Sequence, residues 1–231
     1  MASTFFGLHI GSSALSSFQV ATNTTANNIA NVKTTGYTRQ EATLQAKDAI
    51  NVTARYGSVG TGVTVTSIKQ QRDLYYDNKY WENNSCYGRY EQKLYYMEQI
   101  QNYFKDNGSS VKGFSSVFSQ MFSDLDTLRS KPSDKTVRNQ FISSAQSLCT
   151  YFNQMSDNLS KLQDDCNEEI RNNVDKINSI SEKISLLNKE INQIETGTGV
   201  EASSLRDERA NLIDSLSKIV NVSYNETEVQ K

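Results

Sequence analysis

The sequence predicts a mainly α protein, an elongated bundle of long coiled-coil-like helices with a small β-hairpin region near residues 37–68. Three observations favour this fold class. Only 36% of the 231 residues are hydrophobic, which is lean for a compact core. The chain contains a single proline and 11 glycines. Apolar residues recur at alternating spacings of three and four over most of the chain, so long helices with narrow apolar stripes are favoured over a sandwich or barrel.

The first segment carries a coiled-coil-like seam on one helical face. Its members are Leu8, Gly11, Leu15, Phe18, Thr22, Thr25 and Ile29. The seam is weak in the middle, where small residues lie, so this helix needs close-packed neighbours. We expect the helix to end near residue 31, because Asn28 and Asn31 tolerate left-handed backbone angles at a helix end and Gly36 is a further position where a positive φ costs nothing.

Two short strands are predicted next. Residues 37–46 alternate, with Thr38, Gln40, Ala42, Leu44 and Ala46 on one face, and Val63, Val65 and Ser67 alternate again. The intervening "GSVGTG", residues 57–62, has the wrong glycine spacing for a phosphate-binding loop and lacks a following Lys-Ser/Thr. We interpret it as a turn.

From Asp73 the pattern becomes helical and aromatic. One seam holds Tyr76, Tyr80, Tyr87, Tyr90, Leu94, Met97 and Phe104, with Trp81 beside it. A stacking platform for single-stranded nucleic acid would need a basic groove, whereas acidic residues interleave here. This favours a role in the core or in a subunit contact, and the sequence leaves both open.

Three more helices follow. Phe114 to Leu128 form a dense amphipathic stripe after "DNGSS", residues 106–110. A turn at Pro132, with Ser133 as N-cap, begins a helix from Asp134 to Glu195, on the order of 90 Å long at 1.5 Å per residue. "TGTG", residues 196–199, ends it. Ser203 or Ser204 caps a last helix with Leu205, Leu212, Leu216 and Ile219 facing inward, and Val220, Val222 and Tyr224 then alternate like a strand.

Composition argues against several classes of function. The formal charge of −2 and the pI near 5.6 argue against nucleic acid as a partner. No run reaches the roughly 18–20 apolar residues that span a bilayer, so no membrane insertion is expected, and the N-terminus does not resemble a cleavable signal. We predict no metal site and no cofactor, because Cys86, Cys149 and Cys166 are widely spaced.

An enzyme is also disfavoured. His9 is the only histidine, and nothing near it offers an activated nucleophile. The paired acids Asp164/Asp165 and Glu168/Glu169 are the best catalytic candidates, but they fall on the solvated side of a long helix with no implied cleft. We therefore predict no catalytic residues.

Residues 26–40, "ANNIANVKTTGYTRQ", carry the most specific signal. The pattern A-N-N-x-A-N, a short spacer, then T-x-G-Y-x-R closely resembles the N-terminal signature of the bacterial flagellar rod, hook and hook-associated proteins. The matching residues are Ala26, Asn27, Asn28, Ile29, Ala30, Asn31, Thr35, Gly36, Tyr37 and Arg39. Within the family, residues 59–73, "YEQKL" and residues 204–220 most resemble the members that join hook to filament.

The resemblance implies a structural subunit that self-assembles into a helical tube at the junction between hook and filament. Its implied partners are other copies of itself, the hook protein, the next hook-associated protein and the flagellar export apparatus. Its implied location is the extracellular flagellum, reached without a cleavable signal peptide. The alternatives are another flagellar axial protein, a hook or rod subunit, or an intracellular coiled-coil adaptor or chaperone, which would leave residues 26–40 unexplained.

The resemblance also divides the chain. Residues 1–36 form the axial helix and assembly motif, 37–72 a short β-rich connector, 73–222 an elongated helical domain, and 223–231 the start of a β-rich outer domain. Family members continue into that domain and into a C-terminal helix that pairs with the first helix in the inner tube. We expect this chain to be either truncated or a short homologue.

Assembly is therefore expected to depend on two groups of residues. The assembly motif consists of Asn27, Asn28, Ala30, Asn31, Thr35, Gly36, Tyr37 and Arg39. The axial helix seam consists of Leu8, Leu15, Phe18 and Ile29. Our hypothesis is that the motif ends the axial helix, turns the backbone at Gly36 and directs the chain outward, with Tyr37 as an apolar anchor that has a polar tip.

Overall fold

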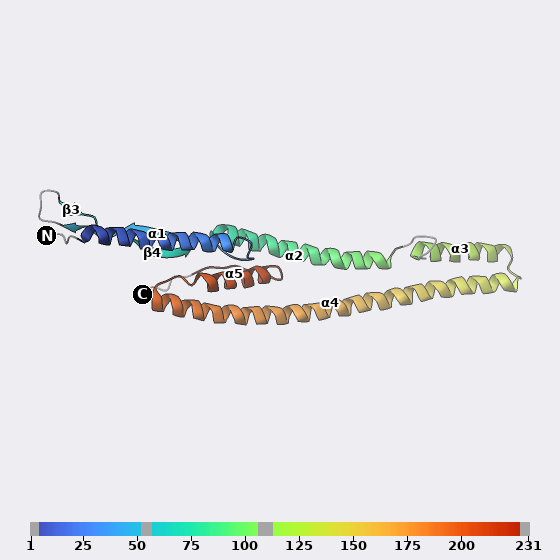
Figure 1. The fold of residues 1–231 in the computed structure, drawn as a ribbon. Helices are drawn as coiled ribbons and strands as arrows, with labels where there is room; N and C mark the ends of the chain where they lie inside the picture. Colours follow the sequence, from blue (N-terminus) through green and yellow to red (C-terminus); the bar gives the residue numbers. More distant parts are fainter. Residues whose placement is uncertain (1–4, 52–56, 106–112, 227–231) are drawn as a thin grey trace. The chain divides into compact units, whose positions relative to one another are not determined.

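The computed structural model describes residues 5–51, 57–105 and 113–226. The described part holds five helices and four strands in two small antiparallel sheets (Figure 1). In order they are α1 Phe6–Ala30, β1 Gln40–Ala46, β2 Ile50–Asn51, β3 Ser58–Val59, β4 Val63–Gln70, α2 Leu74–Tyr103, α3 Phe114–Ser130, α4 Lys135–Thr198 and α5 Ser203–Ser217. The predicted mainly α class, with long helices and a small β region, is confirmed.

Contacts divide the chain into two compact units. The first combines Met1–Ser85 with Ile177–Lys231, and the second is Cys86–Lys176. Helices α2 and α4 each contribute to both units. In the first unit the buried hydrophobic side chains are Trp81, Ile180, Leu187, Ile191, Ala210 and Ile213. The core of this unit is therefore built from side chains of α2, α4 and α5.

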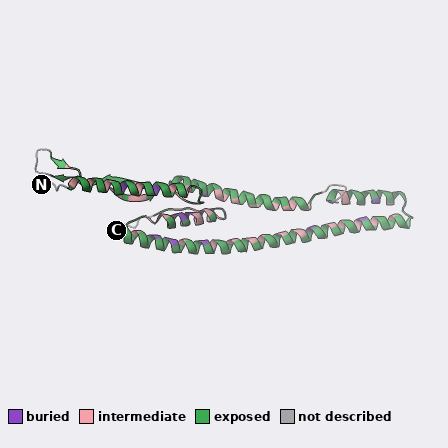
Figure 2. Ribbon diagram, in the orientation of Figure 1, coloured by how far each residue is buried: buried purple, intermediate pink, exposed green. Residues whose placement is uncertain are grey.

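Helix α1 packs on the sheet through its polar face. Its buried residues are Ser17 and Thr24, and the Ser17 hydroxyl donates a hydrogen bond to the Val63 carbonyl at 3.1 Å. At the same contact a Cβ on Gly62 would lie 2.2 Å from Ser13 Oγ, so glycine permits the close approach. Figure 2 shows the rest of the helix mostly exposed. The apolar seam is thus left on the outer side.

The two predicted strands form the main sheet. β1 and β4 pair antiparallel from Gln40 opposite Gln70 to Ala46 opposite Val63, with an irregularity between Thr43 and Leu44. β1 begins three positions later than predicted, because the backbone after Gly36 bonds to other elements first. The glycine stretch at 57–62 is not only a turn, since β3 lies in it and pairs with β2.

The predicted aromatic seam of α2 is not a core within the described residues. Tyr76, Tyr80, Tyr87, Tyr90, Leu94 and Met97 are all more than half exposed, as is Phe104 just beyond the helix. Trp81, beside the seam, is 2% exposed instead. Of the two roles that the sequence left open, packing in this chain's own core is not seen among the described residues, and a subunit contact stays a prediction.

Helix α4 matches the predicted long helix and ends at Thr198, before Gly199 with a φ of 70°. Its N-cap is Asp134 rather than Ser133, since the Asp134 carboxylate accepts a hydrogen bond from the Thr136 N–H at 2.8 Å. In the unit Cys86–Lys176, α3 and α4 share an aromatic cluster of Phe114, Phe118, Phe122, Tyr151 and Phe152. The predicted break at residues 106–110 lies outside the described residues.

Helix α5 departs from prediction in two ways. Its N-cap is Ala202, with no side-chain cap, so neither Ser203 nor Ser204 has the predicted role. Its buried residues are Asp207, Ala210, Ile213 and Ser217, whereas Leu205, Leu212, Leu216 and Ile219 are only partly covered. Residues 220–224 form no strand, and the predicted segment 223–231 lies partly outside the described residues.

Candidate assembly site

The end of α1 is closed by side-chain amides rather than by left-handed backbone. Asn31 is the C-cap residue, with a φ of −98°. Its side-chain N–H donates to the Asn27 carbonyl at 3.0 Å and to Asn27 Oδ1 at 2.9 Å, and its Oδ1 accepts from the Thr34 hydroxyl. Among the described residues only glycines have a positive φ, so Asn28 and Asn31 do not use the left-handed angles that asparagine tolerates.

Asn28 joins the last turns of α1 to the first residue of β1. Its Nδ2 donates to the Gln40 carbonyl at 2.8 Å, and its Oδ1 accepts from the Gln40 N–H at 3.0 Å. The same Oδ1 accepts from the Tyr37 hydroxyl at 2.8 Å, and Asn27 Nδ2 donates to that hydroxyl at 3.2 Å. One asparagine thus satisfies both backbone groups of Gln40 and holds the polar tip of Tyr37.

Gly36 makes the turn between the helix and the strand. Its φ is 77°, as the sequence predicted. A Cβ at this position would also lie 1.8 Å from Asn211 Oδ1 on helix α5. Glycine is therefore required twice, by the backbone angle and by the close approach of a neighbouring helix.

The backbone directly after the turn is bound by the carboxylate of Asp207 on α5. The Thr38 N–H donates to Asp207 Oδ1 at 3.2 Å and to Oδ2 at 3.3 Å. Gln70 Nε2, at the end of β4, donates to the same Oδ1 at 2.8 Å and to the Ser203 carbonyl at 2.9 Å. Burial and, second, the negative charge of Asp207 raise the pKa of Tyr37 above its usual value of 10.0. The Tyr37 hydroxyl therefore stays protonated and able to donate.

A groove lies beside this turn, with a volume of about 600 Å³. Asn28, Asn31, Tyr37 and Arg39 contribute to its lining. The apolar side chains on its rim, Ile29 and Val32, are 69% and 76% exposed. The motif thus borders a concave surface with unburied apolar edges.

The predicted motif residues divide into two sets. The structure brings together Asn27, Asn28, Asn31, Gly36 and Tyr37 in one hydrogen-bonded turn. Ala30, Thr35 and Arg39 are exposed. In the seam, Leu8, Leu15, Phe18 and Ile29 are 60–71% exposed. The fold of the described chain therefore uses the first set and leaves the seam available.

Sequence reasoning missed the three residues that hold the turn from outside. Asp207, Asn211 and Gln70 lie far from the motif in sequence, and Asp207 lies in "RDER", which resembles a solvated charged face. The only available signal was the polar spacing of Asp207, Asn211 and Asp214 on one helical face.

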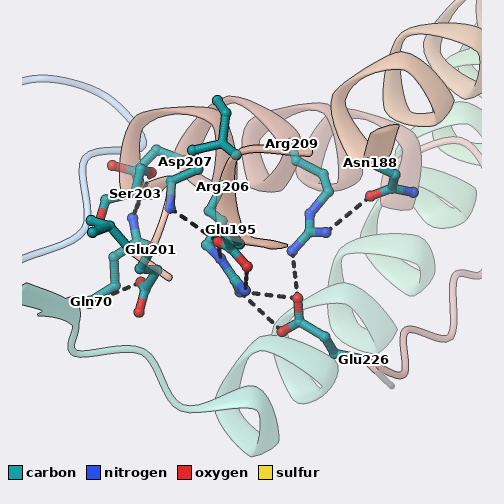
Figure 3. Close-up of polar contacts among 12 residues, drawn as sticks. Gln70, Asn188, Glu195, Glu201, Ser203, Arg206, Asp207, Arg209 and Glu226 are labelled. Carbon is teal, nitrogen blue, oxygen red and sulfur yellow. Dashed lines mark hydrogen bonds and ion pairs between the residues drawn. The ribbon is translucent and has the colours of Figure 1, made fainter. Parts of the chain in front are cut away.

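A network of charges fixes the start of α5 (Figure 3). Arg206 forms a two-pronged pair with Glu195 at the end of α4, with N···O distances of 2.6 and 2.8 Å. Arg206 and Arg209 also bind Glu226, and Arg209 donates to Asn188 Oδ1 at 2.9 Å. Glu195 further accepts from the N–H of Ala202, the N-cap residue of α5. The network replaces a side-chain N-cap for α5.

The arginines lower the pKa of both carboxyl groups in this network. For Glu195 the main cause is the hydrogen bond from Arg206, which outweighs the opposing effect of burial. For Glu226 burial acts to raise the pKa, but the hydrogen bond from Arg209 and the two positive charges together lower it. Both carboxylates are therefore held ionised at neutral pH.

The polar groups of this site hold the chain in one turn between α1 and β1. Its polar groups bond to one another and to backbone, which is the pattern of a structural turn. Within residues 5–51, 57–105 and 113–226, no group of three His, Cys, Asp or Glu side chains is placed to hold a metal ion. No helix in the described part of the chain is long and apolar enough to cross a membrane.

Comparisons with known proteins agree on one group. A family model described as the flagellar hook-associated protein FlgK helical domain matches residues 97–231, and one described as the flagella basal body rod protein matches residues 8–38. Flagellar hook-associated protein 1 of Bacillus subtilis is 34% identical over 98% of this chain and 46% of its own length. Those of Salmonella typhimurium and Escherichia coli are 33% and 31% identical over 92% of this chain and 38% of their own length. The chain spans less than half the length of these relatives.

Proposed function

The chain belongs to the flagellar hook-associated protein family, and we propose that it is a structural subunit of the bacterial flagellum that joins the hook to the filament. In this proposal it has no enzymatic role. Copies of the chain assemble into a helical tube, with α1 on the inside and the chain directed outward at Gly36. Residues 1–36 act as axial helix and assembly motif, 37–72 as connector and 73–222 as helical domain.

The observation that carries the proposal is the orientation of α1. Its polar face packs on the sheet, and its apolar seam of Leu8, Leu15, Phe18 and Ile29 is exposed. A monomer gains nothing from that arrangement, because exposed apolar side chains on a helix lower its solubility. A subunit whose helix is covered on assembly gains the burial of the whole seam.

Partners and location follow from the same proposal. The chain contacts other copies of itself, the hook protein below and the next hook-associated protein above. It reaches the extracellular flagellum through the flagellar export apparatus. A rod or hook subunit is the second candidate, because the rod-protein family model covers residues 8–38, but the helical-domain match over residues 97–231 favours the hook-associated members.

The test is electron microscopy of cells that lack the gene, with an assay for flagellin in the medium. We expect complete hooks without filaments, and flagellin released into the medium. Cells without hooks would instead support a rod or hook subunit. Normal filaments would overturn the proposal.

Motif variants extend the test to residues 26–40. Asn31→Ala removes the amide that caps α1, and Gly36→Val forces a side chain into the space of Asn211. We expect both variants to leave the hooks of the deletion strain bare. An exposed change in the same segment, Lys33→Ala, is the control and should restore filaments.

A further inference from the structure

Helix α5 presents a row of polar side chains, each of which meets a residue from the first 85 of the chain. Asp207 binds the Thr38 backbone and Gln70, and Asn211 abuts Gly36. The third and fourth members are Asp214, which accepts from the Trp81 indole N–H at 2.6 Å, and Ser217, which accepts from Asn84 Nδ2 at 2.8 Å. We call Asp207, Asn211, Asp214 and Ser217 the polar row of α5.

The first and last residues of the polar row, Asp207 and Ser217, are buried. Asp207 is 9% exposed and Ser217 is 0% exposed. A buried carboxylate requires hydrogen-bond donors, and those of Asp207 are the Thr38 N–H and the Gln70 amide. These donors come from the first residues after the turn and from the strand that pairs with β1, so Asp207 fixes both together.

Gly36 and Asn211 add a steric constraint. The space that a Cβ on Gly36 would need is filled by the Asn211 amide, so the turn lies directly on α5. The turn therefore cannot tilt toward α5, and the bond from Thr38 to Asp207 stops it from tilting away. The two contacts together define one direction for the chain as it leaves α1.

The helix that supplies these contacts is itself held on its other side. Arg206, next to Asp207 in the sequence, pairs with Glu195 of α4 (Figure 3). The contacts form a continuous series from Glu195 through Arg206 and Asp207 to Thr38. A shift at the end of α4 would thus reach the turn through a single helix.

We propose that the polar row of α5, with Asp207 as its main positioning residue, sets the angle at which the chain leaves the axial helix and so makes the subunit fit its neighbours. This inference rests on the proposed function, because it takes the turn at 26–40 to be the assembly site. The assembly site is then composite, built from the N-terminal motif and from a helix whose Asp207 lies 169 residues after Thr38.

The test compares Asp207→Ala and Asp207→Asn with the matched changes Glu208→Ala and Glu208→Gln at the exposed neighbouring residue. Hydrogen exchange of the purified chain is followed in peptides from residues 34–40, with peptides from residues 180–191 as internal reference. Asp207→Ala should raise exchange at 34–40 about tenfold and leave the reference unchanged. Asp207→Asn keeps an acceptor oxygen and should raise it less. Both Glu208 variants should match the wild type.

Each allele is then placed in the deletion strain, and filaments per hook are counted. The expected order is wild type, then Asp207→Asn, then Asp207→Ala with mostly bare hooks. A general loss of stability would raise exchange in the reference peptides as well, so a local rise with a graded assembly defect is the signature of positioning. Rescue by the conservative variant supports the role of the acceptor oxygen.

Several outcomes would overturn the inference. Unchanged exchange at 34–40 in Asp207→Ala would remove its structural basis, and raised exchange with normal filaments would remove its link to assembly. If circular dichroism shows that Asp207→Ala is unfolded, the pair Asp207→Asn and Glu208→Gln decides, and equal exchange in the two would count against it. If the wild-type gene itself fails to restore filaments, the proposed function fails, while the exchange data still decide whether Asp207 holds the turn.

Discussion

At the scale of single residues, Asn28 shows what a side-chain amide adds to a motif. The sequence marked it as a residue suited to a helix end, and the structure uses it to bind both backbone groups of Gln40. Its backbone stays helical. An amide can bond to its own turn or to a distant strand, and nothing in the local sequence decides between them. The residue was therefore predictable as important, but its partner was not.

Replacing Asn28 with alanine should destabilise the chain by about 2–3 kcal/mol, because it leaves the N–H and carbonyl of Gln40 without their partner and the Tyr37 hydroxyl with only the hydrogen bond from Asn27. Urea unfolding followed by circular dichroism measures this change. Asn23→Ala is the matched control, since Asn23 is exposed on the same helix. A loss in Asn28→Ala no larger than in the control would contradict the role assigned to this side chain.

Among single residues, the role of Gly36 could be predicted from the sequence and that of Asp207 could not. The positive φ of Gly36 was expected, because glycine in a polar stretch between a helix and a strand has few other uses. Asp207 was missed because its contact with Thr38 spans 169 residues of sequence. The residues of a turn indicate its backbone conformation. Which distant side chain binds that turn depends on the whole fold.

At the scale of elements, α1 has its faces reversed relative to an ordinary surface helix. The sequence left the covering of its apolar seam to close-packed neighbours, and in the structure the seam is exposed while Ser17 and Thr24 face the sheet. The spacing of apolar residues shows that they share a face. It does not show whether the surface that covers them belongs to the same chain.

Because the seam is exposed in the chain by itself, a change in the seam should affect assembly and leave the stability of the fold almost unchanged. Leu15 is 71% exposed, so Leu15→Ala should change the free energy of unfolding by no more than about 0.5 kcal/mol. The same variant should reduce the number of filaments per hook severalfold in the deletion strain. Gln19→Ala, at an exposed position off the seam, should leave both unchanged. A large loss of stability in Leu15→Ala would show that the seam is already buried in the monomer.

The charge network at the start of α5 predicts a dependence on pH. Glu195 and Glu226 have pKa values lowered from 4.5, so each stabilises the folded chain at pH values above 4.5. That stabilisation is lost as the pH falls from 4.5 through the lowered values. The free energy of unfolding should therefore drop as the pH falls below about 5.

Two variants isolate the network. Arg206→Ala removes the partner that Glu195 and Glu226 share, so its unfolding free energy should depend less steeply on pH over the same range. Arg129→Ala removes an arginine whose pair with Asp126 is highly exposed, at 82% and 68%, and should keep the wild-type pH profile. Equal slopes for wild type and Arg206→Ala would contradict the assignment.

Helix α5 also shows why apolar spacing can mislead. Leu205, Leu212 and Leu216 recur at helical spacing, but the buried residues of α5 are Asp207, Ala210, Ile213 and Ser217. The first 85 residues present hydrogen-bond donors to this helix, so polar side chains are buried beside Ala210 and Ile213. Burial follows the partner surface as well as the apolar stripe.

At the scale of the whole molecule, buried side chains are unevenly distributed. Among the described residues, the unit Cys86–Lys176 buries one hydrophobic side chain, Met155, below a tenth of its surface. The other unit buries Trp81, Ile180, Leu187, Ile191, Ala210 and Ile213. Local stability should follow this distribution, because opening a segment with few buried contacts costs little.

Hydrogen exchange along α4 tests this expectation, because the helix runs through both units. Peptides from residues 144–155 should exchange at least about tenfold faster than peptides from residues 180–191. The comparison is internal, since both segments are helical and belong to one element. Uniform exchange along α4 would mean that the aromatic cluster around Phe114 stabilises its unit more than burial indicates.

The positions of the long helices were predictable because they follow from the local spacing of apolar residues. The length of α4 was evident from an uninterrupted three-four repeat without internal proline, and its end from the glycines near residue 199. What could not be predicted was how α2 and α5 turn their faces, since that depends on which surfaces meet. The turn at residues 26–40 was found from its motif, whereas the helix that packs against it was found only from the structure.

The face that α1 leaves exposed has a consequence for the media in which a flagellum works. From Phe5 to Asn31 the chain contains no aspartate, glutamate, lysine or arginine. Screening by dissolved ions weakens attraction between charges, and it has nothing to act on along this helix. Excluded salts, if anything, strengthen apolar burial. A joint made through the seam therefore holds in brine at least as firmly as in fresh water.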